Sequence, residues 1–326
     1  MTGIRRMILA LLPAAASLPC ACSTAEVPPP PPETRGEPPA PQNAAQDARS
    51  AAPAASFTLT QRELLSILEE QERLARDFKA ANRPESELKS RLSVLEQRWA
   101  DYMRENSQDA NSLILFGKFL RSNGDAESAY KVFRQADELE PGIAVIKQQL
   151  ATFEGENKMY AQAYAHLKDA VRLEPQTAVY ARQLGDFLYM AGDRLEQLKA
   201  LTRETRDSEM LSAFGRAAAL SPGDAEAAVR FAQAFYDVKN PDWPAALEAW
   251  RAAEKLSALN VERDSVRINI AAVLLEMGRP GEAAETLGQI SSPGFEGARA
   301  ELMKSAQRMA AQPPARQTNA KTDKPE

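Results

Sequence analysis

The sequence repeats itself at a fixed interval, and this periodicity limits the possible folds more than any other feature. Four sets of positions recur every 34 residues: Gly117, Ala151 and Gly185; Ala129 and Ala163; Ala136 and Ala170; Pro141 and Pro175. Each unit has two helical segments, separated by a turn such as SNGD (122–125) or AGD (191–193), and the second segment ends before proline. A single helix pair leaves an apolar face that only a neighbouring pair can cover, so the period predicts an all-α stack of helix pairs.

The unit at 110–143 is similar to the tetratricopeptide repeat. The positions that carry the similarity are Leu113, Phe116, Gly117, Leu120, Ala129, Phe133, Ala136 and Pro141. The small residues are expected where two helices approach closely, because a larger side chain would overpack the contact. The resemblance covers about residues 85–310 and implies an all-α, right-handed superhelical solenoid of antiparallel helix pairs.

The later units follow the same pattern less regularly. The unit at 144–177 lacks a glycine at its turn, and the third unit closes 13 residues late, at Phe214, Ala217 and Pro222. Either the second helix of the third unit is lengthened, or the segment LTRETRDSE (201–209) is an insertion. Two further units are marked by Phe231, Phe235, Ala246, Trp250 and Ala253 and by Ile270, Ala271, Leu274, Gly278, Ala283 and Leu287. With a capping helix from about 295 to 310, the region 110–310 is expected to hold about five repeats.

Residues 1–22 have the layout of a secretory signal peptide: Arg5 and Arg6, then the apolar run MILALLPAAASL, then small residues. The apolar run is shorter than the roughly 20 residues that span a bilayer. Cys22, between Ala21 and Ser23, resembles the lipidation site of bacterial lipoproteins, although Pro19 replaces the usual leucine. Plain cleavage near Ala16 or Ala21 and a twin-arginine export signal are the alternatives. The lipoprotein resemblance implies an outer-membrane protein that faces the periplasm.

Three segments flank the repeats. Residues 23–56 are rich in proline and alanine, so we expect a tether without a core, and residues 311–326 form a polar tail. Residues 57–109 predict a helical hairpin, with a capping box formed by Thr60 and Glu63 and a second helix after Pro84. The second helix carries a heptad seam of Leu88, Leu92, Leu95, Trp99 and Tyr102. This hairpin is expected to cap the solenoid, with a dimer stalk as the alternative.

The resemblance places the binding surface of such a solenoid on the first helix of each pair, along a concave face. The corresponding residues here are Lys118, Arg121, Gln148, Thr152, Arg182, Asp186, Tyr189, Gln233 and Tyr236. Lys118, Arg121 and Arg182 suggest a basic strip for an acidic peptide. Tyr189 and Tyr236 are the residue type that anchors interfaces. The paired Lys and Asn pattern that binds a chaperone's terminal carboxylate in some family members is absent.

Chemistry other than binding finds little support in the sequence. The two cysteines lie at positions 20 and 22, and His166 is the single histidine, expected as an exposed residue in the second helix of its repeat. Ser86 and Lys89 form an S-x-x-K without its partner motifs, and no phosphate-binding glycine motif occurs. The net charge of −5 without a basic run disfavours nucleic acid. We therefore expect no catalytic residues, metal, cofactor or small-molecule substrate.

These observations predict a non-enzymatic scaffold of the bacterial cell envelope, anchored to the membrane by lipid and holding a peptide or helix of a partner protein. Two alternatives remain open. One is an accessory subunit that docks an envelope enzyme system, such as cell-wall or exopolysaccharide machinery. The other is a structural protein that associates with itself through the heptad seam.

Overall fold

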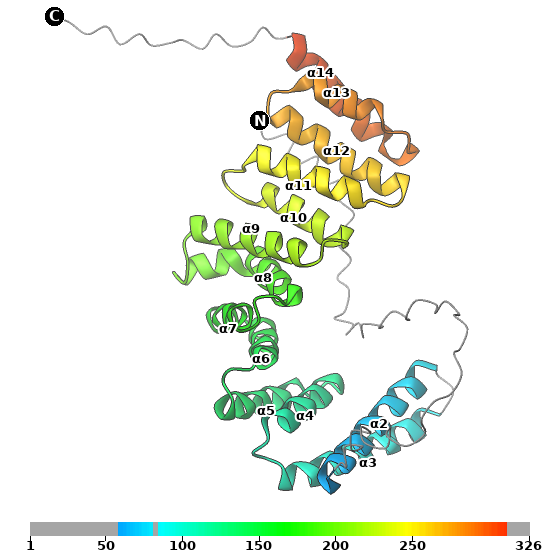
Figure 1. Cartoon of the computed structure of the whole chain (residues 1–326), viewed down its shortest axis with the longest axis vertical. Helices are drawn as coiled ribbons and strands as arrows, with labels where there is room; N and C mark the ends of the chain where they lie inside the picture. The colour runs from blue at the N-terminus through cyan, green and yellow to red at the C-terminus, as the bar shows by residue number, and fades with distance from the viewer. Residues whose placement is uncertain (1–57, 81–83, 312–326) are drawn as a thin grey trace, which may run out of the picture. The chain divides into compact units, whose positions relative to one another are not determined.

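The computed structural model describes residues 58–80 and 84–311, which form α-helices apart from short connections and one 3-10 turn. The elements are α2 (Leu59–Ala80), α3 (Glu85–Glu105), α4 (Ala110–Ser122), α5 (Ala126–Leu139), α6 (Ala144–Glu156), α7 (Tyr160–Leu173), α8 (Ala178–Gln197), α9 (Arg203–Leu220), α10 (Ala225–Asp237), α11 (Trp243–Leu256), α12 (Asn260–Glu276), α13 (Pro280–Gly288), η1 (Pro293–Phe295) and α14 (Glu296–Ala311) (Figure 1). Within these ranges there is no β-strand, and no helix is both long and apolar enough to cross a bilayer. The expected signal sequence, linker and polar tail lie outside the described residues.

Two compact units divide the chain between Phe116 and Gly117, inside α4. In the first unit, α2 packs against α3. The buried apolar residues there include Ile67 and Leu74 of α2 and Leu88, Leu95, Trp99 and Tyr102 of α3. The heptad seam of α3 is thus largely buried inside its own unit, although Val94, beside the seam, is 61% exposed.

The capping box of α2 uses a different threonine from the one expected. Thr58 precedes the helix; its Oγ1 accepts from the Gln61 amide at 3.2 Å, and Gln61 Oε1 accepts from the Thr58 amide at 3.0 Å. Thr60 lies inside α2, so the predicted box of Thr60 and Glu63 is wrong. The segment TLTQ also fits the capping pattern, two residues before TQRE, and the helix begins at the earlier of the two.

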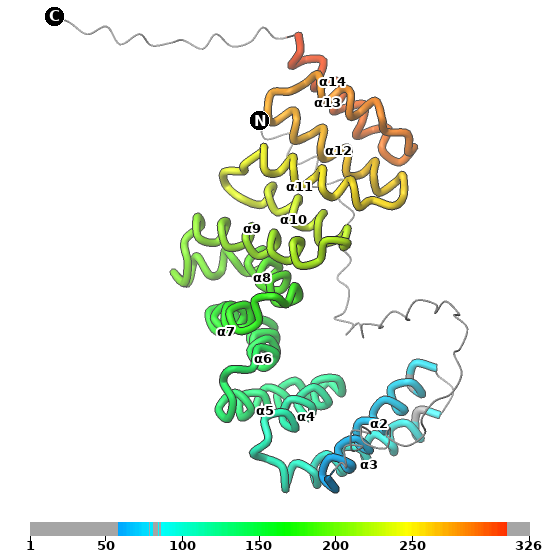
Figure 2. The backbone as a smooth tube through the Cα atoms, in the orientation of Figure 1, coloured from blue at the N-terminus to red at the C-terminus, as the bar shows by residue number. Residues whose placement is uncertain are grey.

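In the second unit, helices pack on their neighbours in sequence. The pairs α6 and α7, α8 and α9, α10 and α11, and α12 and α13 are antiparallel hairpins, and each contacts the next pair through consecutive helices (Figure 2). The last helix, α14, covers α12 and α13, as expected of a capping helix. This pattern of local contacts is that of a repeat solenoid, so the predicted all-α fold class is confirmed.

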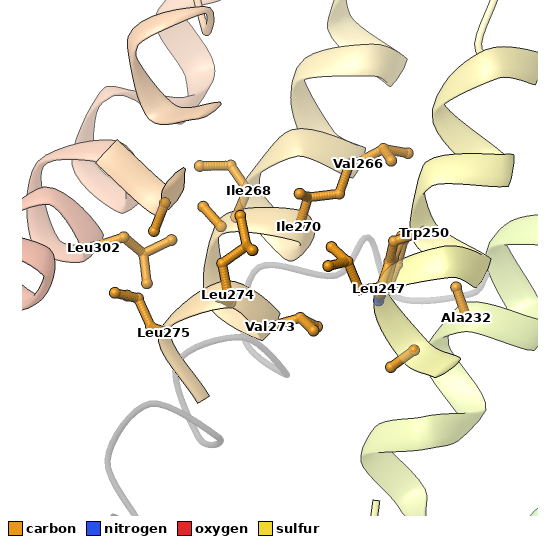
Figure 3. Packing of buried hydrophobic residues seen from close by; sticks show 14 of the residues in the cluster. Ala232, Leu247, Trp250, Val266, Ile268, Ile270, Val273, Leu274, Leu275 and Leu302 are labelled. Carbon is orange, nitrogen blue, oxygen red and sulfur yellow. The ribbon is translucent and has the colours of Figure 1, made fainter. Parts of the chain in front are cut away.

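The core of the second unit's C-terminal part shows how successive pairs share apolar surface. Figure 3 shows side chains from four helices meeting there: Ala232 of α10; Leu247 and Trp250 of α11; Val266, Ile268, Ile270, Val273, Leu274 and Leu275 of α12; and Leu302 of α14. Trp250 and Leu274 are each 1% exposed. Because α12 is buried on both sides, neither neighbouring pair would keep its core without it.

The 13-residue excess of the third unit lies in both helices and in their connection. α8 has 20 residues against 13 in α6, and α9 has 18 against 14 in α7. The connection 198–202 has five residues, whereas 157–159 has three. Together these differences account for the excess, so the extension is a longer hairpin rather than an inserted loop.

Gly192 lies inside α8, so the turn expected at Ala191–Asp193 is wrong. The reason for glycine at this position is the side chain of Arg206 on α9. A Cβ at Gly192 would lie 2.3 Å from Arg206 Cδ. Arg206 is buried, and its guanidinium donates to Asp193 at 2.5 Å and to Glu196 at 3.1 Å. The longer hairpin is thus held together by one buried, ion-paired arginine.

Four helix ends share a residue in the left-handed conformation. Gly124 (φ 87°) follows α4, Lys158 (φ 63°) follows α6, Lys199 (φ 57°) follows α8 and Gly278 (φ 72°) follows α12. In each case the next amide donates to a carbonyl five residues back, as in a helix C-terminal motif. The second unit therefore makes the same turn as the first, although lysine occupies the place of glycine.

Candidate protein-binding face

All nine residues predicted to bind a partner lie on the first helices of the pairs. Lys118 and Arg121 are on α4; Gln148 and Thr152 on α6; Arg182, Asp186 and Tyr189 on α8; and Gln233 and Tyr236 on α10. We call the sides of α6, α8 and α10 that carry these residues the first-helix face. The described residues hold several of these side chains in contacts with one another, and these contacts decide what the face can bind.

A set of ion pairs joins α8 to α10 across this face. Arg182 Nη2 donates to Glu226 Oε1 at 2.5 Å, and Arg182 Nε lies 3.7 Å from Asp186 Oδ2. Asp186 Oδ1 in turn lies 3.6 Å from Arg230 Nε. Successive first helices are therefore held in register by alternating charges rather than by apolar contact alone.

Arg230 is the centre of this set. Its guanidinium carbon lies 3.9 Å from the ring centroid of Phe214 and 4.7 Å from that of Tyr189, which are cation–π distances. Its nitrogens lie 3.6 Å from a carboxylate oxygen of Asp186 and 3.6 Å from one of Asp237. Burial raises the pKa of both carboxyl groups above the ordinary value, and Arg230 opposes the rise. The arrangement keeps two poorly solvated carboxylates next to one cation.

The expected basic strip is largely neutralised. Arg121 Nη2 donates to Glu156 Oε1 at 2.9 Å, and Arg182 pairs with Glu226 and Asp186, while Lys118 is exposed. Two of the three cations thus already have carboxylate partners on the same face, and an acidic peptide would have to displace them. The face is a poor attractor for negative charge as a whole.

Gln148 and Thr152, on α6, are half-buried. Thr152 Oγ1 donates to the Gln148 carbonyl at 2.9 Å, a bond within the helix that leaves no hydroxyl proton for a partner. Gln233 is also half-buried on α10. These positions offer polar contact area but no concentrated charge.

The two tyrosines have different surroundings. Tyr236 lies against Trp243 and Trp250, with ring centroids 5.9 Å and 6.1 Å away, and its hydroxyl donates to the Asn269 carbonyl at 3.4 Å. Burial raises the pKa of Tyr236. Tyr189 is 48% exposed and has one ring face toward Arg230. Of the two, Tyr189 is the aromatic ring that a partner can reach.

Two apolar residues beside Tyr189 were not among the predicted positions. Met190 is 74% exposed and Val179 is 55% exposed, both on α8. The positions 179, 182, 186, 189 and 190 follow the spacing of one helix face. α8 therefore presents an apolar row along a face whose charges are already paired.

His166 is not the exposed histidine that the sequence suggested. Its Nδ1 lies 2.8 Å from Oε2 of Glu154, a carboxylate only 1% exposed, and its own side chain is 24% exposed. The other carboxylate oxygen of Glu154 accepts from the Tyr130 hydroxyl at 3.1 Å. This trio joins α5, α6 and α7. In the described ranges there is no group of three or more His, Cys, Asp or Glu side chains that could hold a metal ion.

Sequence reasoning missed Glu226, Arg230 and Asp237, which complete the ion pairs of the first-helix face. Arg182 and Glu226, like Asp186 and Arg230, are 44 residues apart. This separation differs from the 34-residue period because the 13-residue extension lies between them, so no fixed offset in the sequence identifies the pairs.

Comparison with known proteins gives no match to a family model and none to a curated protein. Solved structures do match. A structure described as "YrrB: a TPR protein with an unusual peptide-binding site" is 20% identical, over 66% of this chain and 98% of that chain, with a TM-score of 0.45. PilF of Pseudomonas aeruginosa is 14% identical, over 74% and 99%, with a TM-score of 0.45.

A third match is the Naa15/Naa10 complex bound to HypK-THB, 13% identical over 76% of this chain and 35% of that one, with a TM-score of 0.51. At these identities the likeness concerns the fold and not the ligand. In fold, the described part of the chain is a tetratricopeptide-like solenoid of antiparallel helix pairs.

Proposed function

We propose that this chain is a non-enzymatic scaffold that binds a helix or extended segment of a partner protein along the first-helix face. The observation that carries the proposal is the exposed apolar row Val179, Tyr189 and Met190 on α8. Tetratricopeptide-like folds serve many partners, so the fold alone does not name one. The peptide binding named for YrrB is consistent with such a role.

Binding to this face would rest on apolar contact more than on charge. Tyr189 is held by Arg230 on one side, so little side-chain entropy is lost when a partner covers the other. Met190, which is flexible and polarizable, adapts to varied surfaces. The paired charges of Arg182, Asp186 and Glu226 surround this row and disfavour partners whose charged groups meet like charge.

A matched pair of double variants tests the proposal. Tyr189→Ala with Met190→Ala removes the apolar row of α8, and Leu259→Ala with Val261→Ala removes two equally exposed apolar residues at the start of α12. Each variant and the original protein are used for affinity capture from solubilised envelope, with quantitative identification of the retained proteins. A protein lost with the α8 variant and retained by the α12 variant supports the proposal. Equal retention by all three chains contradicts it.

We further propose that the protein is exported and anchored to the outer membrane by lipid on Cys22, with the solenoid in the periplasm. The support is the sequence of residues 1–23, which lie outside the described structure. Acyl chains contribute about 0.8 kcal/mol per buried methylene, so a lipidated protein would stay with the membrane fraction. Cys22→Ser should release it, and Cys20→Ser should not. Continued membrane association of the Cys22→Ser chain would remove the lipid anchor from the account.

A further inference from the structure

A second concave surface lies on the other helices of the stack. A cavity of about 410 Å³ opens between α7, α8 and α9, which places it away from the first-helix face. Its apolar lining consists of Val171, Ala181, Leu184 and Ala213, together with Pro175. The volume falls in the range of roughly 300–1,000 Å³ that is typical of ligand pockets. An apolar floor of this size accepts one or two large apolar side chains.

Three cations surround this floor: Lys168, Arg172 and Arg216. The Lys168 ammonium lies 4.4 Å from the ring centroid of Tyr164, and Arg216 Nε donates to the Pro175 carbonyl at 2.9 Å. Neither side chain pairs with a carboxylate in the described part of the chain. Arg172 donates to Asp169 at 2.8 Å, an exposed pair within α7 that contributes little stability. The rim therefore presents positive charge that the fold itself does not neutralise.

The one carboxylate in the lining is already held by a hydroxyl. Tyr164 donates to Glu209 Oε2 at 2.5 Å, and burial together with this bond raises the pKa of Tyr164. Glu209 is thereby directed toward α7, so it is not the partner of Lys168 or Arg216. The cavity differs in this respect from the first-helix face, where carboxylates occupy the cations.

We propose that this cavity, which we call the α7–α9 groove, binds an acidic segment of a partner protein that carries apolar side chains. The apolar side chains enter the floor between Val171, Leu184 and Ala213, and carboxylates of the segment pair with Lys168, Arg172 and Arg216. Charge complementarity selects this occupant, because a basic or neutral segment would leave the rim cations without partners. The groove is independent of the first-helix face, so one scaffold can hold two segments.

The groove is tested with a synthetic probe of stated composition. The probe is a fluorescein-labelled eight-residue peptide in which pairs of acidic residues alternate with pairs of leucine, and its binding is followed by fluorescence anisotropy. Two further peptides replace either the acidic residues by lysine or the leucines by alanine. The account predicts that the acidic leucine peptide binds at least about tenfold more tightly than either.

Variants of the protein locate the binding. Lys168→Glu with Arg216→Glu should weaken binding of the acidic leucine peptide at least about tenfold, whereas Arg251→Glu with Lys255→Glu, on α11, should leave it unchanged. Ser212→Trp, at an exposed position in the groove, should block binding, whereas Ala219→Trp, exposed on the same helix outside it, should not. Circular dichroism and thermal unfolding verify that each variant is folded. Equal binding of the acidic and lysine peptides, or unchanged binding by both groove variants, would overturn the proposal.

Discussion

Gly185 and Phe214 pack against each other in the same way as Gly117 and Phe133, although the sequence separations differ. A Cβ built on Gly185 would lie 2.8 Å from Phe214 Cε1, and one built on Gly117 would lie 2.7 Å from Phe133 Cε1. The first pair is 29 residues apart and the second 16, and the difference equals the 13-residue excess of the third unit. The longer hairpin thus extends beyond a contact that keeps the register of the repeat.

Gly185→Ala should destabilise the protein. The new methyl group would overlap the buried ring of Phe214, and overpacking of this kind costs about 1–3 kcal/mol. The midpoint of urea unfolding should fall accordingly. Gly223→Ala is the control, because a Cβ there meets nothing within 4 Å. An unchanged midpoint for Gly185→Ala would mean that α8 and α9 do not approach closely at this residue.

Lys158→Gly should stabilise the protein, by about 0.5–1 kcal/mol. Lys158 has a φ of 63°, a conformation that costs a side-chain-bearing residue about 1–2 kcal/mol, and part of the gain is offset by the greater freedom of glycine in the unfolded chain. Asn157→Gly, at a residue with a φ of −95°, should only destabilise. Urea unfolding measures both. If the two substitutions behave alike, the turn after α6 is not the one described.

Arg230→Met should destabilise the protein and change its pH dependence. The substitution leaves Asp186 and Asp237 without their cation, at a cost of about 2–3 kcal/mol, less than for a fully buried pair because the Asp186 side chain keeps 39% of its exposure. Both carboxyl groups have a pKa raised by burial, so the folded state binds their protons more tightly than the unfolded state.

Stability of the Arg230→Met variant should therefore rise as pH falls from neutral toward the unfolded value of 3.8, and its deficit should shrink. Adding Asp186→Asn and Asp237→Asn should restore part of the loss at pH 7. Thermal unfolding from pH 7 to pH 4 gives the comparison. A deficit that stays constant over this range would contradict the ion pairs described.

Asp264→Asn should have the opposite pH dependence. Asp264 is 2% exposed and accepts hydrogen bonds from the Ser291 amide at 3.0 Å, the Ser292 amide at 2.9 Å and the Ser292 hydroxyl at 2.7 Å. Burial alone would raise its pKa, but these bonds and Arg267 outweigh burial and lower it. The folded state therefore binds this proton less tightly than the unfolded state.

The stability contributed by the Asp264 carboxylate is thus present above the unfolded value of 3.8 and is lost as pH falls through the lower folded pKa. Asp264→Asn should cost about 2 kcal/mol at pH 7, and the difference from the original protein should diminish below pH 4. Glu301→Gln, on the exposed side of α14, is the control for loss of one carboxylate. A difference independent of pH would argue against a charged Asp264.

The sequence predicted the fold because the repeat is written in local features. Small residues at Gly117 and Gly185 mark the close contacts, and the apolar period marks the buried faces. The same local reading failed at Gly192, which resembles a turn glycine but makes room for Arg206, twelve or more residues away in the chain. Thr60 failed for a smaller reason, since two overlapping capping patterns compete and Thr58 forms the one observed.

The candidate sites were harder to predict, because pairings between helices decide them. Arg121 and Arg182 look like free cations in the sequence, but Glu156 and Glu226 accept their hydrogen bonds. His166 looks solvated until α6 places Glu154 beside it. The apolar residue Met190 is visible in the sequence, but its exposure depends on how neighbouring pairs stack.

The contact between Gly185 and Phe214 tests the account most directly, through a double-mutant cycle measured by urea unfolding. The account predicts that Gly185→Ala costs about 1–3 kcal/mol in the original protein and less than about 0.5 kcal/mol when Phe214→Ala has already removed the ring. Costs that simply add would show that the two residues do not touch. The shared register of the long and short hairpins would then be wrong.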